Sequence, residues 1–539
     1  MKAGWFSARS ASSPLILPLL SILLSLVIVI TTGCGSSNST PPPPKLSGNT
    51  RLTVVLSSTA NDQVTDFNLY FQTLTLTNQS GKSISLLASQ QPSEFMHLNG
   101  QLEPLTTVVV PQDVYTAATV TLGRAEFVCL SQYPPTGGIL ISHYSPIDQP
   151  PVVNLLAPIT ITGDSMVLSL NLQVSSSAIF PSCYTSPDFE GYSMSPTFNL
   201  APVATASSPS NATNGLVTGL VASVASVGTS DSSLTLTIPA AAFGTRTVTA
   251  HVSNATVFQG ISDFSALSAG MFLNLDGALQ SDGSLLATRI EVENPNAINV
   301  FTGPIMSIDE IIPVVQLYGR TELGPLLLNP TNNQPGQYYE FPGFDFSQAT
   351  FLVSGQFTNL STLPFVPSFN SSSFVAGQNV DVTSPTFKMI GGSGPYTPAE
   401  TLTLIPQTID GAIEGVSTAG NFTVYTVSLA DYDLFPQLAV QQGQTTVLTD
   451  PSHVQVYVDN NTQKLNSQAL APGSTLRFYG LVFNDNGTLR MDCRQVSDGV
   501  AFSPQASAST RPASGISHII QRPAPAGLRQ IIATTGRQR

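Results

Sequence analysis

The stretch LSAGMFLNLDG, residues 267–277, indicates how the body of this chain folds. Its Ala269-Gly270 pair is a turn signal, and the residues after it alternate as in a strand with one buried face. Related stretches occur twice more, AGQNVDV at 376–382 and PGSTLRFYG at 472–480. The recurrence of a turn followed by the same kind of strand predicts a repeated β unit.

Other motifs extend the repeat on both sides of this turn. The three units open with VTGLVAS at 217–223, FTGPIMS at 301–307 and GAIEGV at 411–416. DGSL at 282–285 and NGTL at 486–489 are hairpin signals that close the first and third units. We expect units at 216–294, 299–409 and 410–500, the second divergent because of insertions at 323–346 and 384–398.

Each unit is expected to form a small OB-like β-barrel. Gly219 and Gly303 lie inside strand patterns, where a missing side chain permits sharp coiling. Five or so strands over about 80 residues are typical of such a barrel. In the order of its motifs the repeat resembles a family of domains of unknown function, number 5666, often found in tandem in envelope proteins. The resemblance implies no known activity.

Residues 51–203 predict an antiparallel β-sandwich. Short runs rich in Val, Leu and Thr, separated by turn signals, read as strands at 52–56, 67–76, 83–87, 106–110, 117–122, 152–161 and 166–174. The opening LTVVL, the LNG turn at 98–100 and Val110-Pro111 leading to Tyr115 are similar to a second family of unknown function, number 4382, found at the start of bacterial envelope lipoproteins. Residues 204–215 read as a flexible linker.

Residues 1–33 have the pattern of an export signal. Lys2 and Arg9 precede residues 15–30, an uncharged and mostly apolar run. As a helix this run would span about 24 Å, short of the roughly 30 Å of a hydrocarbon core, which favours a secretory leader over a spanning helix. Residues 31–34, TTGC, resemble the bacterial lipobox, although Thr31 replaces the usual Leu.

The lipobox resemblance implies that Cys34 carries lipid and anchors the protein to a membrane. Ordinary cleavage beside an incidental Cys is the alternative. Gly35 stands where an Asp would indicate retention at the inner membrane, so the resemblance implies an outer-membrane lipoprotein. Residues 34–50, with four consecutive prolines at 41–44, predict a stiff tether.

The charge of the chain is low and unevenly distributed. Charged residues make up 9% of the sequence, and the net charge is −13. Residues 1–33 and 501–539 contain bases and no acids, which leaves 12 basic against 32 acidic residues in the body. Such a body repels phosphate backbones and disfavours nucleic-acid binding. Residues 501–539 read as a disordered basic tail, with a short apolar segment at 516–520; contact of the tail with an anionic surface is the alternative.

The remaining cysteines have two different expected fates. Cys129 and Cys183 both fall in the sandwich segment and are predicted to form a disulfide, worth roughly 4 kcal/mol on the chain-entropy model. Cys493 alternates with Leu489 and Met491 on one strand face. A buried, inert thiol is the favoured interpretation of Cys493, and a reactive thiol is the alternative.

The sequence contains no catalytic or metal-binding motif that we recognise. The histidines, none at a metal-ligand spacing, are His97, His143, His251, His453 and His518. Residues 431–433 (DYD) and 459–461 (DNN) offer oxygens for Ca²⁺, but exposed loop polarity explains them equally. The aromatic cluster at 338–346 is either barrel core or an exposed ligand patch.

We therefore expect a non-catalytic, lipid-anchored envelope protein without a cofactor, whose partner is another envelope protein or a polysaccharide. The alternative is a carboxylate-based hydrolase acting on envelope polymers. A cleft with two carboxylates of raised pKa would favour the enzyme, and featureless barrels would favour the binding module. Nucleic-acid binding is the weakest hypothesis.

Overall fold

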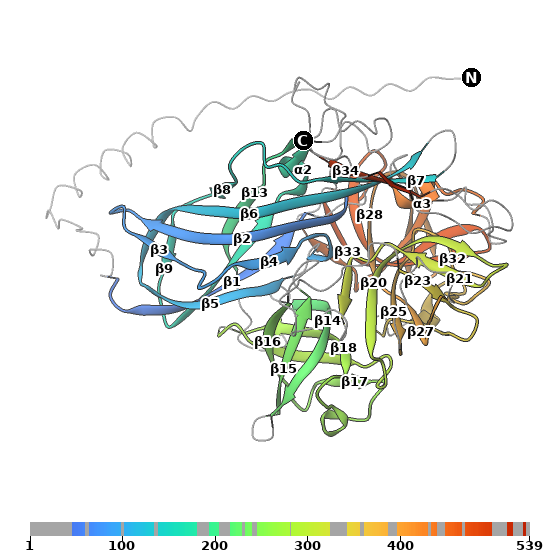
Figure 1. Ribbon diagram of the computed structural model, residues 1–539, viewed down its shortest axis with the longest axis horizontal. Helices are drawn as coiled ribbons and strands as arrows, with labels where there is room; N and C mark the ends of the chain where they lie inside the picture. Colours follow the sequence, from blue (N-terminus) through green and yellow to red (C-terminus); the bar gives the residue numbers. More distant parts are fainter. Residues whose placement is uncertain are drawn as a thin grey trace, which may run out of the picture. The chain divides into compact units, whose positions relative to one another are not determined.

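A computed structural model of the chain divides into a segment Met1–Leu46 and a compact unit Ser47–Arg539. The structure describes residues 46–59, 64–98, 102–133, 138–179, 193–203, 216–228, 232–239, 245–280, 282–323, 342–355, 360–385, 396–429, 433–438, 448–465, 469–498, 515–520 and 532–534. The predicted all-β class is confirmed (Figure 1). Within the described residues, no helix is long and apolar enough to cross a bilayer.

The N-terminal strands form two sheets around an apolar core. The first, in the order β5-β1-β10-β13-β8, contains β1 (Asn49–Ser58), β5 (Glu103–Pro111), β8 (Val152–Leu155), β10 (Ser165–Leu172) and β13 (Thr197–Val203). The second contains β2 (Val64–Asn78), β3 (Ser83–Ser85), β4 (Gln91–Glu94), β6 (Asp113–Tyr133), β7 (Gly138–Tyr144) and β9 (Ile159–Ile161). Phe71 of the second sheet packs on Phe198 of the first, so the two sheets bury a shared face.

The sandwich differs from the expected purely antiparallel arrangement. β1 pairs with β10 in parallel, and β13 pairs with β8 in parallel. A parallel pair needs a long crossover, and the strands of the second sheet supply it between β1 and β10. Each predicted strand overlaps an observed one, with 152–161 split into β8 and β9. β4, β7 and β13 were not predicted.

Three small barrels follow in the described chain. The first contains β14 (Leu216–Val227), β15 (Ser233–Pro239), β16 (Thr245–His251), β17 (Val257–Gln259), β18 (Phe272–Leu279) and β19 (Leu285–Glu291). The second contains β20 (Asn299–Asp309), β21 (Val314–Leu317), β22 (Thr321–Leu323), β23 (Gly343–Asp345), β24 (Thr350–Val353), β25 (Asn379–Ser384), β26 (Thr397–Pro398) and β27 (Thr401–Leu404). The third contains β28 (Gln407–Ala419), β29 (Phe422–Leu429), β30 (His453–Val458), β31 (Gln463–Leu465), β32 (Thr475–Asp485) and β33 (Thr488–Asp498).

All three barrels share one connectivity. In each, the first long strand pairs antiparallel with the second and the fourth, and the third strand closes the barrel by a parallel pairing with the fifth, which in the second barrel is divided into β26 and β27. The second barrel also has an additional strand, β22, which pairs antiparallel with β20. The closing pairs are β16–β19, β23–β26 and β30–β33. A short extra strand, namely β17, β24 or β31, pairs in parallel with the last strand of its barrel. The divergent second unit therefore keeps the OB-like plan despite its insertions.

The turn that begins the repeated motif has the same geometry in all three barrels. Gly270, Gly377 and Gly473 have φ of 92°, 96° and 90°, a region that favours glycine. The amide of each donates a hydrogen bond to a strand-one carbonyl, from Val224, Ile305 and Ile413 respectively. This shared anchor fixes the register between the first and fourth strands.

The compact unit also contains shorter elements. They are α2 (Val174–Ser177), α3 (Leu434–Leu438), the 3₁₀ turns η1 (Met96–Leu98), η3 (Phe264–Ala266) and η4 (Leu360–Thr362), and the pair β11 (Ala178–Ile179) and β12 (Ser193–Met194). In the predicted tail, β34 (Gly515–Ile520) pairs antiparallel with β7, and β35 (Ile532–Thr534) pairs with β34. The predicted linker 204–215 lies outside the described residues.

The modules share cores and polar contacts with one another. Val55 and Val167 of the sandwich belong to the apolar core of the first barrel. Leu481 and Phe483 of the third barrel belong to that of the second. A Cβ on Gly283, at the tip of the predicted β18–β19 hairpin, would lie 2.4 Å from Oγ1 of Thr107. The hairpin tip therefore fits directly against the first sheet of the sandwich.

Candidate functional site

One strand position carries a buried polar side chain in every barrel. Asn274, Asp381 and Arg477 each lie four residues after the turn glycine, in β18, β25 and β32, and each is at least nine-tenths buried. The register with the first strand agrees, because their partners Val221, Thr302 and Asp410 are also equivalent. Burying a polar group is costly unless it is hydrogen-bonded, so each side chain needs a partner at this position.

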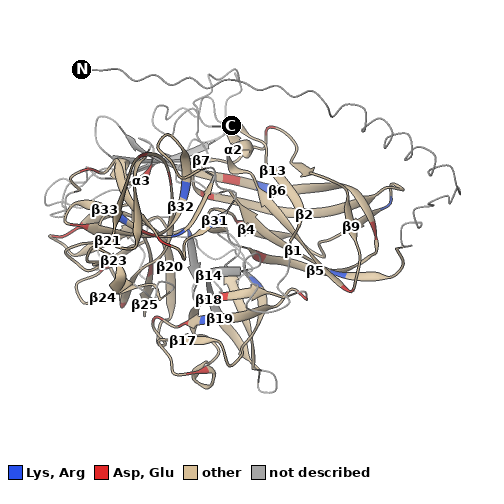
Figure 2. Ribbon diagram, turned by 180° about the vertical axis from the view of Figure 1, so that it is seen from behind, with Lys and Arg blue, Asp and Glu red and all other residues tan. Residues whose placement is uncertain are grey.

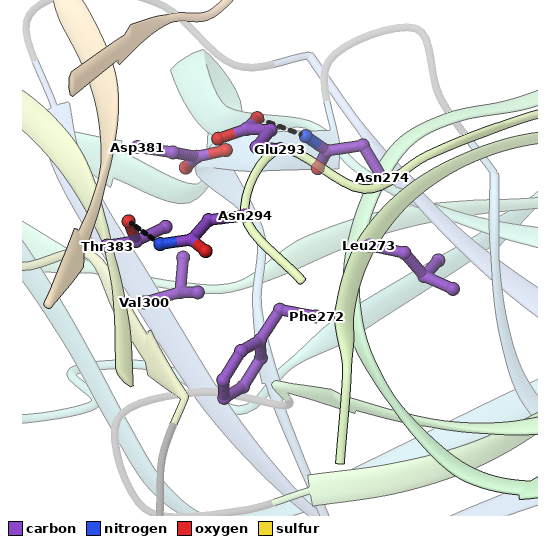
Figure 3. Close-up of a pocket in the computed structure, with 8 residues that line it drawn as sticks. All are labelled: Phe272, Leu273, Asn274, Glu293, Asn294, Val300, Asp381 and Thr383. Atoms are coloured by element: carbon purple, nitrogen blue, oxygen red, sulfur yellow. Dashed lines mark hydrogen bonds between the residues drawn. The ribbon is translucent and has the colours of Figure 1, made fainter. Parts of the chain in front are cut away.

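In the first two barrels this position contributes to a shared pocket. The cavity of about 10 Å³ is lined by Phe272, Leu273, Asn274, Glu293, Asn294, Val300, Asp381 and Thr383. Figure 3 shows the carboxylates of Glu293 and Asp381 pointing toward one another beside Asn274. Asn274 Nδ2 donates to Glu293 Oε1 at 2.6 Å, and Thr302 Oγ1 donates to Asp381 Oδ1 at 2.5 Å. A cavity of this size holds about one water molecule.

Both carboxyls in the pocket are hard to ionise. Burial raises the pKa of Glu293 well above its usual value, and the charge of Asp381 raises it further. Burial raises the pKa of Asp381 to about 7, although hydrogen bonds from Thr302 and Asn274 partly oppose this. Glu293 as a residue is only half-buried, but its carboxyl is buried and lies beside Asp381 and Asn274 (Figure 3). None of the residues lining the pocket is basic.

An ion-paired cluster adjoins the pocket on the side of the first barrel. Arg289 donates from Nε to Asp276 at 2.8 Å and from Nη1 to Glu291 at 2.6 Å, and all three side chains are largely buried. Two further bonds cross to the second barrel. The Gly355 amide donates to Glu291 Oε1 at 2.7 Å, and Asn294 Nδ2 donates to Glu400 Oε2 at 2.7 Å. This contact surface between the first two barrels, pocket and cluster together, is called the barrel junction below.

The third barrel handles the same position differently. Arg477 Nε lies 3.4 Å from Asp410 Oδ1, so a buried base there faces a buried acid on the neighbouring strand. The third barrel is joined to the second mainly by other groups, since Gln378 Nε2 donates to the Val482 carbonyl and Gln407 Nε2 donates to the Gly377 carbonyl.

A second polar cluster joins the sandwich to the barrels. His97 Nδ1 lies 2.8 Å from Glu94 Oε2, and His97 Nε2 lies 2.9 Å from Glu103 Oε2. Burial raises the pKa of Glu94, but the hydrogen bond and charge of His97, the charge of Arg320 and the Met96 amide together lower it below its usual value. Arg246 of β16 contacts Glu103 and also donates to the Pro92 carbonyl at 2.8 Å.

The second barrel reaches the same part of the sandwich. Arg320 Nε donates to the Thr65 carbonyl at 2.8 Å. Figure 2 shows how few charged residues the described ribbon carries. Glu94, Glu103 and Arg246 are among the few that are buried. His97 therefore links two carboxylates, one from β4 and one from β5.

Most of the residues predicted from sequence to carry chemistry are not placed by the structure. Cys34 and Cys183 lie outside the described residues, and Cys129 lies on β6 without a described side chain. The predicted lipidation and disulfide therefore stay predictions. Cys493 is confirmed as buried, beside Leu489 and Met491, and burial raises the pKa of its thiol, which keeps it inert.

The candidate calcium loops and the aromatic cluster have simpler explanations where they are described. Asp459 accepts the Asn461 and Thr462 amides at 2.8 and 3.0 Å, as in a turn closed by its own side chain. Phe344 and Phe346 are buried in the core of the second barrel, which supports the core interpretation for these two rings. Among the described residues, no group of three or more His, Cys, Asp or Glu side chains is arranged to hold a metal ion.

The barrel junction escaped prediction, although a signal for it exists. A polar residue recurs four positions after each turn glycine, within strands whose neighbouring residues are largely apolar. Glu94-x-x-His97 similarly places two groups near one another across one turn of chain. In both cases only the tertiary contacts reveal that the groups meet.

Comparison with known proteins identifies one part of the chain. Residues 218–291, nearly the whole of the first barrel, match the family described as "Domain of unknown function (DUF5666)". The match confirms the resemblance stated for the first repeat. No curated protein matches the chain.

Proposed function

We propose that this chain is a non-catalytic, lipid-anchored protein of the bacterial envelope that presents a rigid set of β-modules to another envelope component. The observation that supports this most is the repetition of one barrel plan with differing buried polar residues at the equivalent position. What is common to the three barrels is the turn glycine, the strand register and the core. A repeated catalytic group, as expected of a repeated active site, does not recur at that position in the described strands.

The anchor is the first part of the proposal. It rests on the signal-like residues 1–33, the lipobox-like residues before Cys34 and the similarity of the sandwich to family 4382. Export to the outer membrane would then place the modules on a tether of Ser and Pro residues.

Mass spectrometry of the mature N-terminus tests the anchor. We expect a chain that begins at Cys34 and carries acyl groups, and a Cys34→Ser variant that is released from membranes. An unmodified chain that keeps residues 1–33 would contradict the proposal.

The partner is the second part of the proposal. The acidic body disfavours nucleic acid, and an envelope protein or a polysaccharide fits a surface with few charges. Crosslinking in intact envelopes, followed by identification of captured molecules, tests this. We expect one envelope component to be captured more strongly from a strain that makes the wild-type protein than from a strain that lacks this protein. Recovery of this chain alone would count against the proposal that its β-modules bind another envelope component.

A specific observation favours the alternative, an acid–base hydrolase. Glu293 and Asp381 are paired carboxylates whose pKa values are raised, as in sites that share a proton. The pocket opposes it, because about 10 Å³ leaves no room for a sugar or a peptide.

Incubation of the full chain with envelope polymers separates the two functions. Soluble products that form with wild-type protein but not with Glu293→Gln would establish the hydrolase. We expect no difference between the two.

A further inference from the structure

The barrel junction buries more acids than bases. The groups that face it come from six segments: Asp276 and Asn274 on β18, Arg289 and Glu291 on β19, Glu293 and Asn294 after β19, Thr302 on β20, Asp381 and Thr383 on β25, and Glu400 with Thr403 at β27. Arg494 of β33 is 3.9 Å from Asp276. If every group were ionised, five carboxylates would meet two guanidinium groups.

The two bases, Arg289 and Arg494, lie near only some of these carboxylates. Arg289 is held between Asp276 and Glu291, and Arg494 also approaches Asp276. Glu293 and Asp381 are left with neutral partners, namely the Asn274 amide and the Thr302 hydroxyl. Both carboxyls line the same pocket. Two negative charges in one water-poor site repel strongly, so this pair is stable only when at least one carboxyl is neutral.

The pair also joins two modules. Glu293 follows the last strand of the first barrel, and Asp381 lies on the fourth strand of the second. We propose that a proton shared by Glu293 and Asp381 holds the barrel junction closed, and that loss of this proton loosens the first barrel from the second. This proposal does not depend on the lipid anchor or on the identity of a partner.

The direction of the pH effect follows from linkage. Asp381 has a pKa of about 7 in the closed junction and an ordinary value of 3.8 when exposed, so closure takes up a proton between these values. The stabilising effect is complete below the ordinary pKa and is lost as the pH rises through about 7. One proton changes the opening constant by up to about tenfold per pH unit within this window.

Hydrogen exchange of the full chain, corrected for intrinsic rates, measures this opening through the amides of β18 and β25. We expect exchange at the junction to increase by up to about tenfold per pH unit between pH 5 and pH 7. In Asp381→Asn, whose side chain is neutral at every pH, the increase should become smaller, because only the buried carboxyl of Glu293 still titrates. Glu293→Gln should reduce it if Asp381→Asn fails to fold.

Asp164→Asn, in an exposed turn of the sandwich, is the matched control and should keep the wild-type profile. A wild-type profile in both junction variants would overturn the proposal. A second arm adds Ca²⁺ or EDTA at pH 8. If Ca²⁺ slows exchange in wild type but not in Glu293→Gln, a cation closes the junction and the proton proposal is wrong.

Discussion

The second and third barrels place opposite charges at one strand position. Asp381 faces a second carboxyl across the barrel junction, whereas Arg477 faces Asp410 within its own barrel. The backbone is the same in both, since each residue lies four positions after a glycine of similar φ. The comparison shows that the barrel plan fixes the burial of this position but not its charge. The side chain at this position determines whether its polar contact lies within one barrel or reaches the neighbouring barrel.

The largest effect should come from removing the base of the third barrel. Arg477→Met leaves buried Asp410 without the guanidinium beside it, and breaking a buried pair costs about 3–5 kcal/mol of the free energy of unfolding. Urea unfolding of the full chain measures this loss. The double variant Asp410→Asn with Arg477→Met should recover most of it. Equal losses in the single and double variants would show that the pair does not set the cost.

Two of the turn glycines, Gly270 and Gly377, have similar backbone conformations but different surroundings, so substitutions at the two can be compared directly. A Cβ on Gly377 would lie 2.7 Å from a ring carbon of Phe435, whereas a Cβ on Gly270 meets no atom within 4 Å. Gly270→Ala should cost about 1–2 kcal/mol from its left-handed backbone alone. Gly377→Ala should cost about 2–4 kcal/mol, because overpacking adds to that strain. Equal melting temperatures for the two variants would contradict this difference.

The smallest effect should come from Asn274 in the first barrel. Asn274→Ala removes the amide that donates to Glu293, an ordinary hydrogen bond of about 0.5–1.5 kcal/mol while that carboxyl is neutral. Because an ionised carboxylate binds the amide more strongly, the loss measured by urea unfolding should grow from pH 5 to pH 8. If the loss of unfolding free energy instead becomes smaller from pH 5 to pH 8, the carboxyl that ionises in this range is not the one that Asn274 contacts.

Local signals predicted most of the fold. Gly270, Gly377 and Gly473 are visible in sequence because a turn with positive φ needs glycine, and the strands that follow alternate in polarity. Pairing between strands that are far apart in the sequence could not be predicted from such local signals. The parallel pairing of β1 with β10 joins strands that are separated in sequence by β2 to β9, from both sheets of the sandwich.

The pairing of Glu293 with Asp381 could not be predicted for the same reason, although the recurring polar position that contains Asp381 is visible in the sequence. Glu293 and Asp381 are ordinary polar residues in isolation, and their shared character arises only where two barrels meet. Cys493 was predictable, because its burial follows from the alternation of a single strand. The burial of a residue within one strand can thus be predicted from the sequence. Contacts between modules depend on how the modules pack and cannot be predicted in this way.

The short connection between β27 and β28 has a practical consequence for dividing this protein. Only residues 405 and 406 separate the two strands, and side chains of the third barrel, Phe422, Tyr457 and Leu481 among them, complete the core of the second. A recombinant fragment that starts at Gln407 would expose these side chains to water and self-associate. The last two barrels are therefore best expressed and handled as a pair.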